Sequence, residues 1–181
     1  MRSIQCGVTL VELLVAVALV AAVAALGAPA LAEYQQGARL AAATVELVAD
    51  LQRARAEALQ RNRRVTLCKS PDGLQCTTQG GWEQGWIVFH DENGNRLVDE
   101  DEEVLARRAA LEGQLRVVGN QPVASYVTYT AVGASKLVGG GFQAGTVTIC
   151  RRSEGPAAAR QVILNAIGRP RVQKATVASC R

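Results

Sequence analysis

Basic side chains near the C-terminal end are the residues of this sequence with the clearest capacity for chemistry. Arg169 and Arg171 flank Pro170 and follow Gly168, so a turn-forming glycine and a proline of fixed φ would hold two guanidinium groups on a stiff loop. Guanidinium groups match the oxygens of phosphates. Further basic residues nearby can join the same patch: Arg151, Arg152, Arg160 and Lys174. We predict that these residues bind a phosphate-bearing partner.

The distribution of charge agrees with this prediction. Residues 104–181 contain eleven basic and two acidic residues, a net charge of 11 − 2 = +9, within a chain whose total is +4. Such a segment should attract polyanions, and contacts to a nucleic-acid backbone would be independent of sequence and sensitive to salt. The alternative is a structural turn whose solvated arginines keep the domain soluble without any partner.

The acidic segment 91–103 has seven acids against one base, Arg96. Five of its oxygen-bearing residues occupy positions 1, 3, 5, 9 and 12 of a calcium-loop pattern: Asp91, Asn93, Asn95, Asp99 and Glu102. Position 6 of that pattern should be glycine, but it is Arg96. A tight hairpin turn at Asn93-Gly94 explains the same residues without a metal, so we predict neither a metal nor a cofactor.

Four cysteines follow the apolar N-terminal region: Cys68, Cys76, Cys150 and Cys180. If that region exports the remainder, two disulfides are expected, and four cysteines allow three pairings. Cys68–Cys76 would close a short loop around a turn sequence, and Cys150–Cys180 would then fasten the C-terminal tail. A zinc site is the competing interpretation, but no C-x-x-C pair is present.

Enzymatic activity has little support in the sequence. His90 is the only histidine, and no nucleophile pattern accompanies it, so we interpret it as structural. The sequence has no G-x-S-x-G, no H-E-x-x-H and no phosphate-binding loop with its lysine. Trp86 lies in an apolar strand pattern and is expected in the core, whereas Trp82, beside two glycines, is left open as a platform for stacking on bases.

The positioning elements begin with an apolar N-terminal segment. The 20 residues from Leu13 to Ala32 carry no charge, which is enough for a helix to span a bilayer. Glu12 stands at the start of this stretch, where a carboxylate is costly and suggests a specific task. Pro29 should kink the helix or unwind it locally. An ordinary signal anchor is the alternative interpretation of this segment.

The helical pattern continues to about Asn62. One face is predicted to pack on a globular domain, and it comprises Leu40, Thr44, Leu47, Leu51, Ala54 and Ala58. The opposite, charged face comprises Arg39, Glu46, Asp50, Arg53, Glu57 and Arg61. We divide the chain into residues 1–7, a transmembrane helix over 8–34, an amphipathic half over 35–62, and a β-rich domain over 63–181.

The N-terminal residues Cys6-Gly7-Val8-Thr9-Leu10-Val11-Glu12 resemble the class III signal of type IV pilins and type II secretion pseudopilins. The resemblance implies that a prepilin peptidase cuts after Gly7 and that the new terminal residue, Val8, is methylated. It also implies that Glu12 neutralises the terminal amine of a neighbouring subunit inside an apolar filament core, where an unpaired charge would be costly.

After Asn62 the pattern changes to short strands separated by turn signals, which predicts an α+β chain with one long helix and an antiparallel β domain. The predicted strands are Arg64–Cys68, Gly85–His90, Val104–Ala106, Leu115–Val118, Tyr126–Tyr129, Gly145–Cys150, Gln161–Asn165 and Pro170–Val172.

Four blocks within this part resemble the FimT/GspH group of minor pilins and pseudopilins. The blocks begin at Leu51, Gly85, Asn93 and Ile167, and the last contains Gly168-Arg169-Pro170-Arg171. Members of the group that act in natural transformation carry a G-R-x-R motif implicated in DNA binding, and Arg169 and Arg171 match it. The resemblance therefore implies a minor type IV pilin that binds double-stranded DNA and supports its uptake.

The same resemblance implies the partners and the location of the protein. The partners would be DNA, prepilin peptidase and other major and minor pilins. The protein would cross the bacterial inner membrane once, with its globular domain in the periplasm, and later enter a pilus at the cell surface. The alternative is a structural minor pilin or pseudopilin that primes assembly of a pilus or of a type II secretion filament without binding DNA.

Overall fold

A single long helix precedes eight strands in the computed structural model, which describes residues 9–181. Helix α1 runs from Leu10 to Arg61. It starts in a capping box, in which the Glu12 N–H donates to Thr9 Oγ1 (3.2 Å) and the Thr9 N–H donates to Glu12 Oε2 (3.5 Å). After its last residue, Asn62 adopts a φ of 53°, and the Arg63 N–H then donates to the Ala58 carbonyl at 3.3 Å.

Two units make up the chain, Met1–Arg39 and Leu40–Arg181. Within the first, α1 is long and apolar enough to cross a membrane, its most apolar window having a mean hydropathy of 2.6 with none of it buried. The helix is unbroken at Pro29, so the local unwinding considered above does not occur. The predicted cleavage site at Gly7–Val8 lies outside the described residues.

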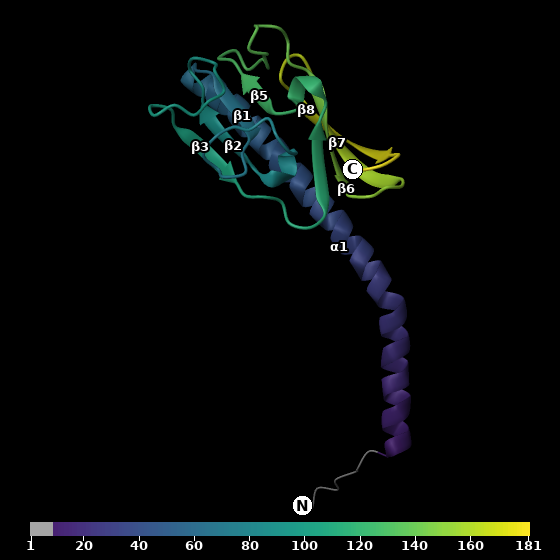
Figure 1. The fold of residues 1–181 in the computed structure, drawn as a ribbon. Coiled ribbons are helices and arrows are strands. Elements are labelled where there is room, and N and C mark those ends of the chain that lie inside the picture. Colours follow the sequence, from purple (N-terminus) through teal and green to yellow (C-terminus); the bar gives the residue numbers. More distant parts are fainter. Residues whose placement is uncertain (1–8) are drawn as a thin grey trace, which may run out of the picture. The chain divides into compact units, whose positions relative to one another are not determined.

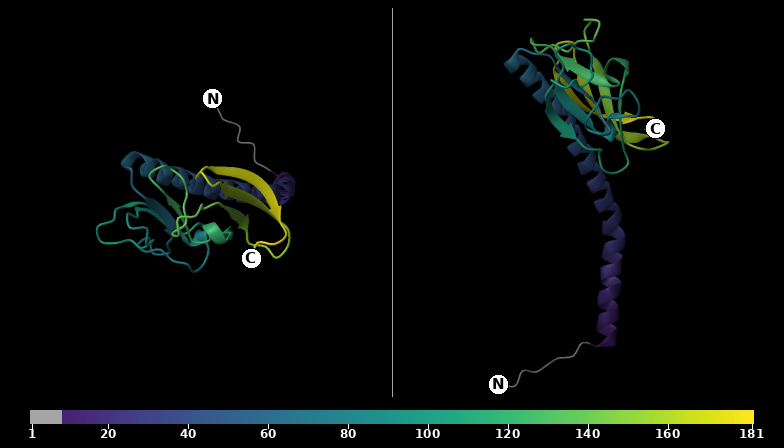
Figure 2. Two further views of the ribbon diagram at one scale, coloured as in Figure 1. Left: turned by 90° about the horizontal axis from the view of Figure 1, so that it is seen from above. Right: turned by 60° about the vertical axis from the view of Figure 1, so that its left-hand side comes forward.

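The second unit contains two antiparallel sheets that pack with the C-terminal half of α1 around one core (Figures 1 and 2). Sheet A has the order β3-β2-β1-β5, with β1 at Val65–Lys69, β2 at Trp86–His90, β3 at Val104–Arg108 and β5 at Tyr126–Tyr129. Sheet B has the order β4-β6-β7-β8, with β4 at Leu115–Gly119, β6 at Gly145–Arg151, β7 at Ala157–Leu164 and β8 at Pro170–Val177. The predicted α+β fold is confirmed.

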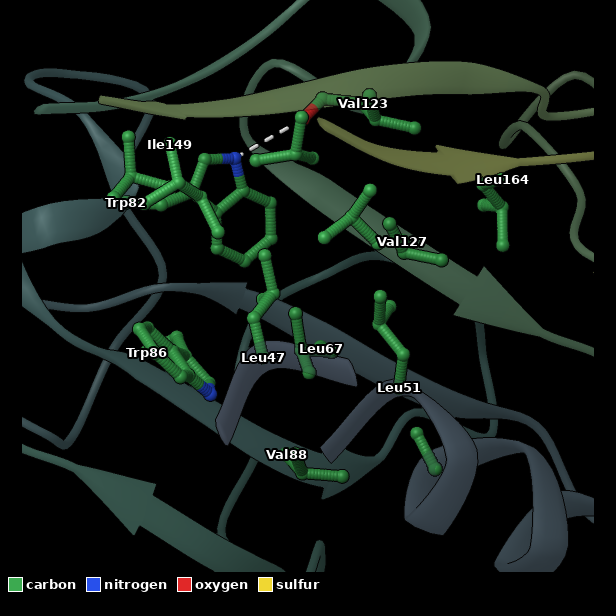
Figure 3. Close-up of a cluster of buried hydrophobic side chains, with 14 of the residues drawn as sticks. Leu47, Leu51, Leu67, Trp82, Trp86, Val88, Val123, Val127, Ile149 and Leu164 are labelled. Atoms are coloured by element: carbon green, nitrogen blue, oxygen red, sulfur yellow. Dashed lines mark hydrogen bonds between the residues drawn. The ribbon is translucent and has the colours of Figure 1, made fainter. Parts of the chain in front are cut away.

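Every residue of the predicted apolar face of α1 is buried, from Leu40 to Ala58. Figure 3 shows Leu47 and Leu51 of this face beside Leu67 of sheet A and the two tryptophans. Trp82, in the short 3-10 helix Trp82–Gln84, is fully buried, and its Nε1–H donates to the Val123 carbonyl at 3.1 Å. Because its ring is enclosed in the core, the considered role of Trp82 as a base-stacking platform is wrong.

Asp50 is a correction to the predicted charged face of α1. Its side chain is 1% exposed, and it accepts hydrogen bonds from Trp86 Nε1 (2.9 Å) and Arg108 Nε (2.7 Å). The carboxylate of Asp50 raises the pKa of the Arg108 guanidinium above its usual value through this hydrogen bond and the ion pair. Asp50 therefore ties the helix to two strands of sheet A.

Both disulfides are present, with the predicted pairing. Cys68–Cys76 closes a loop on sheet A, and Cys150–Cys180 joins β6 to the C-terminal tail. Within the first loop, the N–H groups of Leu74 and Gln75 and the Ser70 hydroxyl donate to Asp72 Oδ1, which lowers the pKa of that carboxyl.

The acidic segment 91–103 forms the long connection between β2 and β3, so Asn93-Gly94 does not form the predicted tight hairpin turn between two strands. Its polar side chains bond one another: Asn93 Nδ2 and Asn95 Nδ2 donate to Asp99 Oδ2 at 2.8 and 2.9 Å. Asp91 is fully buried and accepts a hydrogen bond from Thr66 Oγ1 at 2.6 Å. Within residues 9–181, no group of three or more acidic, histidine or cysteine side chains has an arrangement that can hold a metal ion.

Candidate nucleic-acid interface

The hairpin of β7 and β8 carries the predicted phosphate-binding residues. Its last cross-strand pair joins Leu164 to Pro170, and the turn lies between them. The side chain of Asn165 organises this turn, because its Oδ1 accepts the Arg169 N–H at 2.8 Å while its carbonyl accepts the Gly168 N–H at 2.9 Å. The backbone that carries Arg169 is thus held from both ends.

Gly168 is required by both conformation and space. Its φ is +79°, and a Cβ added there would lie 2.6 Å from the Gly133 carbonyl and 2.8 Å from the ring of Tyr129. The turn therefore packs directly on the loop that follows β5. A hydrogen bond from Ser135 Oγ to the Asn165 carbonyl (3.4 Å) joins the same two segments.

Arg169 and Arg171 are both exposed. Within residues 9–181, neither guanidinium forms an ion pair. Arg169 on the turn and Arg171 at the start of β8 are thus two exposed charges on ordered backbone, and without an ion-pair partner they are available to bind an external anion. Arg169 and Arg171 are therefore the part of the predicted patch that is most available to a partner in solution.

Arg160 and Lys174 form a second pair of cations. They lie directly opposite each other on β7 and β8. Like charges at opposed positions of an antiparallel pair repel, so an anion bound between them would relieve an unfavourable contact. Because side chains alternate along a strand, Arg171 and Lys174 point to opposite faces of sheet B. The hairpin therefore presents cations on both of its faces.

Arg151 and Arg152 lie at the other end of sheet B. Gly145 at the start of β6 pairs with Leu164 beside the turn, whereas Arg151 ends the same strand. Six residues of strand span roughly 20 Å. Arg152 also lies 3.7 Å from the partly buried carboxylate of Glu83, which pairs with Arg116 as well. The structure thus separates these two arginines from the turn.

Lys136 is a cation that the sequence prediction missed. It lies in the loop after β5, next to Ser135, and its Nζ sits 3.9 Å from the ring centre of Phe142, which is 65% exposed. The loop and the β7–β8 turn lie next to each other at the top of Figure 1. The sequence did contain a signal for this pair, because Lys136 precedes and Phe142 follows the turn-forming run Gly139-Gly140-Gly141.

The predicted assembly residue, Glu12, is exposed at the start of α1, where it takes part in the capping box with Thr9. A carboxylate in the first turn is favoured by the helix dipole. The structure thus places its carboxylate beside the backbone of Thr9, the residue that follows the predicted new N-terminus at Val8.

A long apolar helix that continues into a small domain of antiparallel sheets is the architecture of a pilin. Comparison with known proteins agrees: residues 43–168 match the family described as type II transport protein GspH, and residues 2–28 match the prokaryotic N-terminal methylation motif. The chain belongs to the GspH family, and it is a minor pilin or pseudopilin of the GspH type.

Solved structures show the same fold. The type IV minor pilin FimU of Pseudomonas aeruginosa PAO1, in a P21 crystal form, is 20% identical, with a TM-score of 0.58 over 82% of this chain and 99% of that chain. A P65 crystal form of FimU is 22% identical, with a TM-score of 0.52 over 78% of this chain and 100% of that chain. No curated protein matches this chain significantly.

Proposed function

We propose that this minor pilin binds double-stranded DNA non-specifically through the β7–β8 hairpin and supports DNA uptake in natural transformation. The observation that carries the proposal is the exposed pair Arg169 and Arg171, the first on a hydrogen-bonded turn and the second at the start of β8, both free of ion pairs within the described residues. The net charge of +9 over residues 104–181 would add long-range attraction for a polyanion.

The geometry gives the proposed contacts an order. Arg169 and Arg171 bind first, because both reach solvent on ordered backbone. Arg160 and Lys174 point to the opposite face from Arg171, so they contribute only if the DNA also reaches that face, where an anion would relieve their mutual repulsion. Arg151 and Arg152, at the far end of the sheet, contribute only if the DNA lies along the whole length of sheet B.

The remaining steps of the proposed function concern assembly. Prepilin peptidase cleaves after Gly7, Val8 is methylated, and Glu12 pairs with the terminal amine of a neighbouring pilin. Before assembly the apolar helix holds the chain in the inner membrane with the globular unit in the periplasm, which agrees with two disulfides in that unit. Intact-mass measurement of the membrane form tests the cleavage: retention of Met1–Gly7 in cells with active peptidase contradicts it.

A structural role without DNA binding is the second candidate function. The match to the GspH family over residues 43–168 favours it, because that family is described by type II transport. In this case the chain would prime a pilus or a secretion pseudopilus, and the arginines would only keep the surface soluble.

DNA binding by residues 35–181 separates the two candidates, since this fragment contains every buried residue of the described structure. Fluorescence anisotropy with a random-sequence duplex is measured over a series of salt concentrations. Arg169→Gln with Arg171→Gln should weaken binding to every sequence alike. The slope of log K against log salt should become shallower by about 1.8, or about 0.9 for each lost phosphate contact.

The matched control is Arg151→Gln with Arg152→Gln, which removes the same charge from the far end of sheet B. It should change affinity and slope less than the turn variant. Equal effects from both variants would mean that binding follows net charge and not the hairpin. If the turn variant binds DNA as tightly as the parent at equal salt, the hairpin is not the DNA-binding site. If the parent does not bind DNA even at low salt, the structural role becomes the preferred function.

A further inference from the structure

A hollow of about 430 Å³ lies beside the connection between β2 and β3, far along the sequence from the arginine hairpin. The carboxylates of Glu92, Asp101, Glu102 and Glu103 line it, together with the imidazole of His90. Arg61 and Arg63 complete the lining. This hollow plays no part in the proposed DNA binding.

His90 is the first indication that the hollow binds something. Its side chain is 5% exposed, and neither ring nitrogen has a hydrogen-bond partner among the described residues. A neutral imidazole has one donor and one acceptor, and buried polar groups in folded proteins are nearly always paired. The ring lines the hollow and therefore has an unused acceptor and an unused donor at its wall.

The charge balance is the second indication. Glu92 pairs with Arg63 at 2.5 Å and Glu103 with Arg61 at 3.6 Å. Within residues 9–181, Asp101 and Glu102 form no ion pair. Burial, reinforced by the carboxylates of Asp91 and Asp99, raises the pKa of Glu102. The hollow thus keeps two carboxylates that no cation compensates.

We propose that this hollow receives the arginine side chains of the β7–β8 hairpin of a second copy of the chain. A guanidinium has five N–H donors in a planar fork, which suit two carboxylates and the acceptor nitrogen of an imidazole. The chain itself exposes such groups at Arg169 and Arg171, and among residues 9–181 no ion pair joins them to a carboxylate. The two complementary patches are therefore left to meet between copies.

Such a contact joins two different patches and is heterologous, so copies would add head to tail. The inference does not require the proposed DNA binding, but both use the same arginines. A hairpin seated in the hollow of a neighbour is closed to DNA, and only a copy at the end of a row exposes its hairpin.

Sedimentation velocity of oxidised residues 35–181 at low salt tests the contact with two variants. The hollow variant is Asp101→Asn with Glu102→Gln, and the hairpin variant is Arg169→Gln with Arg171→Gln. Each variant alone should self-associate about tenfold or more weakly than the parent. An equimolar mixture should form a one-to-one complex and nothing larger, because each variant supplies the patch that the other lacks.

A matched control is Glu112→Gln with Glu154→Gln, which removes two carboxylates outside the hollow and should associate like the parent. His90, the only histidine in the sequence, provides a local probe. In ¹⁵N-labelled hairpin variant, its ring resonances should shift on adding unlabelled hollow variant and saturate at one equivalent. A parent that stays monomeric at low salt, a mixture that stays monomeric, or an unmoved His90 resonance would overturn the proposal. DNA binding by the parent is measured separately, at protein concentrations below those at which it self-associates, so that either proposal can fail without the other.

Discussion

The two sheets of the globular unit differ in how far their strands are buried. Every residue of β1 and β2 in sheet A is buried, so both faces of these strands are covered. In sheet B, β8 buries none of its residues fully, and much of β7 is only half-buried. Sheet A is enclosed at its two central strands, whereas sheet B contributes β4, β6 and β7 to the core and leaves β8 as an open surface.

The disulfides give the largest expected difference between the sheets. Replacing Cys150 and Cys180 by serine should cost about 3–4 kcal/mol of unfolding free energy, and replacing Cys68 and Cys76 about 2–3 kcal/mol, because the first pair spans 30 residues and the second 8. Urea unfolding of the fragment measures both. An equal or reversed order would show that sheet A depends more on its covalent link than loop length predicts.

Asp50 tests the attachment of sheet A to α1. Replacing it by alanine leaves the buried Trp86 Nε1–H without its partner and removes the ion pair of Arg108. We expect a loss of about 2–3 kcal/mol, less than for a fully buried pair because the Arg108 side chain is 41% exposed and can be hydrated. The exposed Glu46→Ala on the same helix should change stability by less than about 0.5 kcal/mol. Similar losses for the two variants would contradict the role given to Asp50.

Two buried hydroxyl groups of sheet A provide a finer test. Thr66 Oγ1 bonds both Asp91 and Thr128, so Thr66→Val should cost about 1–2 kcal/mol. The Tyr129 hydroxyl has no partner among the described residues, so Tyr129→Phe should leave the unfolding free energy within about 0.5 kcal/mol of the parent. A large loss for Tyr129→Phe would reveal a hydrogen bond to this hydroxyl.

The pH dependence of Tyr129 is the smallest expected effect. Burial raises the pKa of its hydroxyl well above the usual value. Above about pH 10 the unfolded chain loses the proton of this hydroxyl, whereas the folded chain keeps it. The free energy of unfolding therefore declines as the pH rises beyond that point. The decline should be shallower in Tyr129→Phe, as measured by urea unfolding between neutral and alkaline pH.

The sequence was most informative where a single element determines the pattern. The buried stripe of α1 and all eight strands follow from local periodicity, and each predicted strand has a counterpart. Strand β8 extends to Val177, whereas the prediction stopped at Val172. The prediction stopped there because the next residues, Gln173 and Lys174, are polar and do not resemble a strand. Its pairing with β7, a contact between segments, supplies the structure that local pattern does not indicate.

The sequence was least informative where distant segments meet. Asp50 was assigned to the charged face because its partners Trp86 and Arg108 lie 36 and 58 residues away. The six predicted cations appeared as one patch because sequence proximity does not reveal strand ends or faces. The division into two sheets, and the packing of the loop carrying Lys136 on the arginine turn, likewise depend on contacts that no local pattern encodes.

Strand β8 is the last strand of sheet B, so one of its sides has no neighbouring strand among the described residues. Open edges of this kind invite pairing with other chains, and charged residues on them oppose it. Arg171 and Lys174 therefore protect a concentrated pilin preparation from edge-to-edge aggregation, whatever they bind. Neutralising them should lower the solubility of the folded fragment, and light scattering at increasing protein concentration would detect the onset of that aggregation.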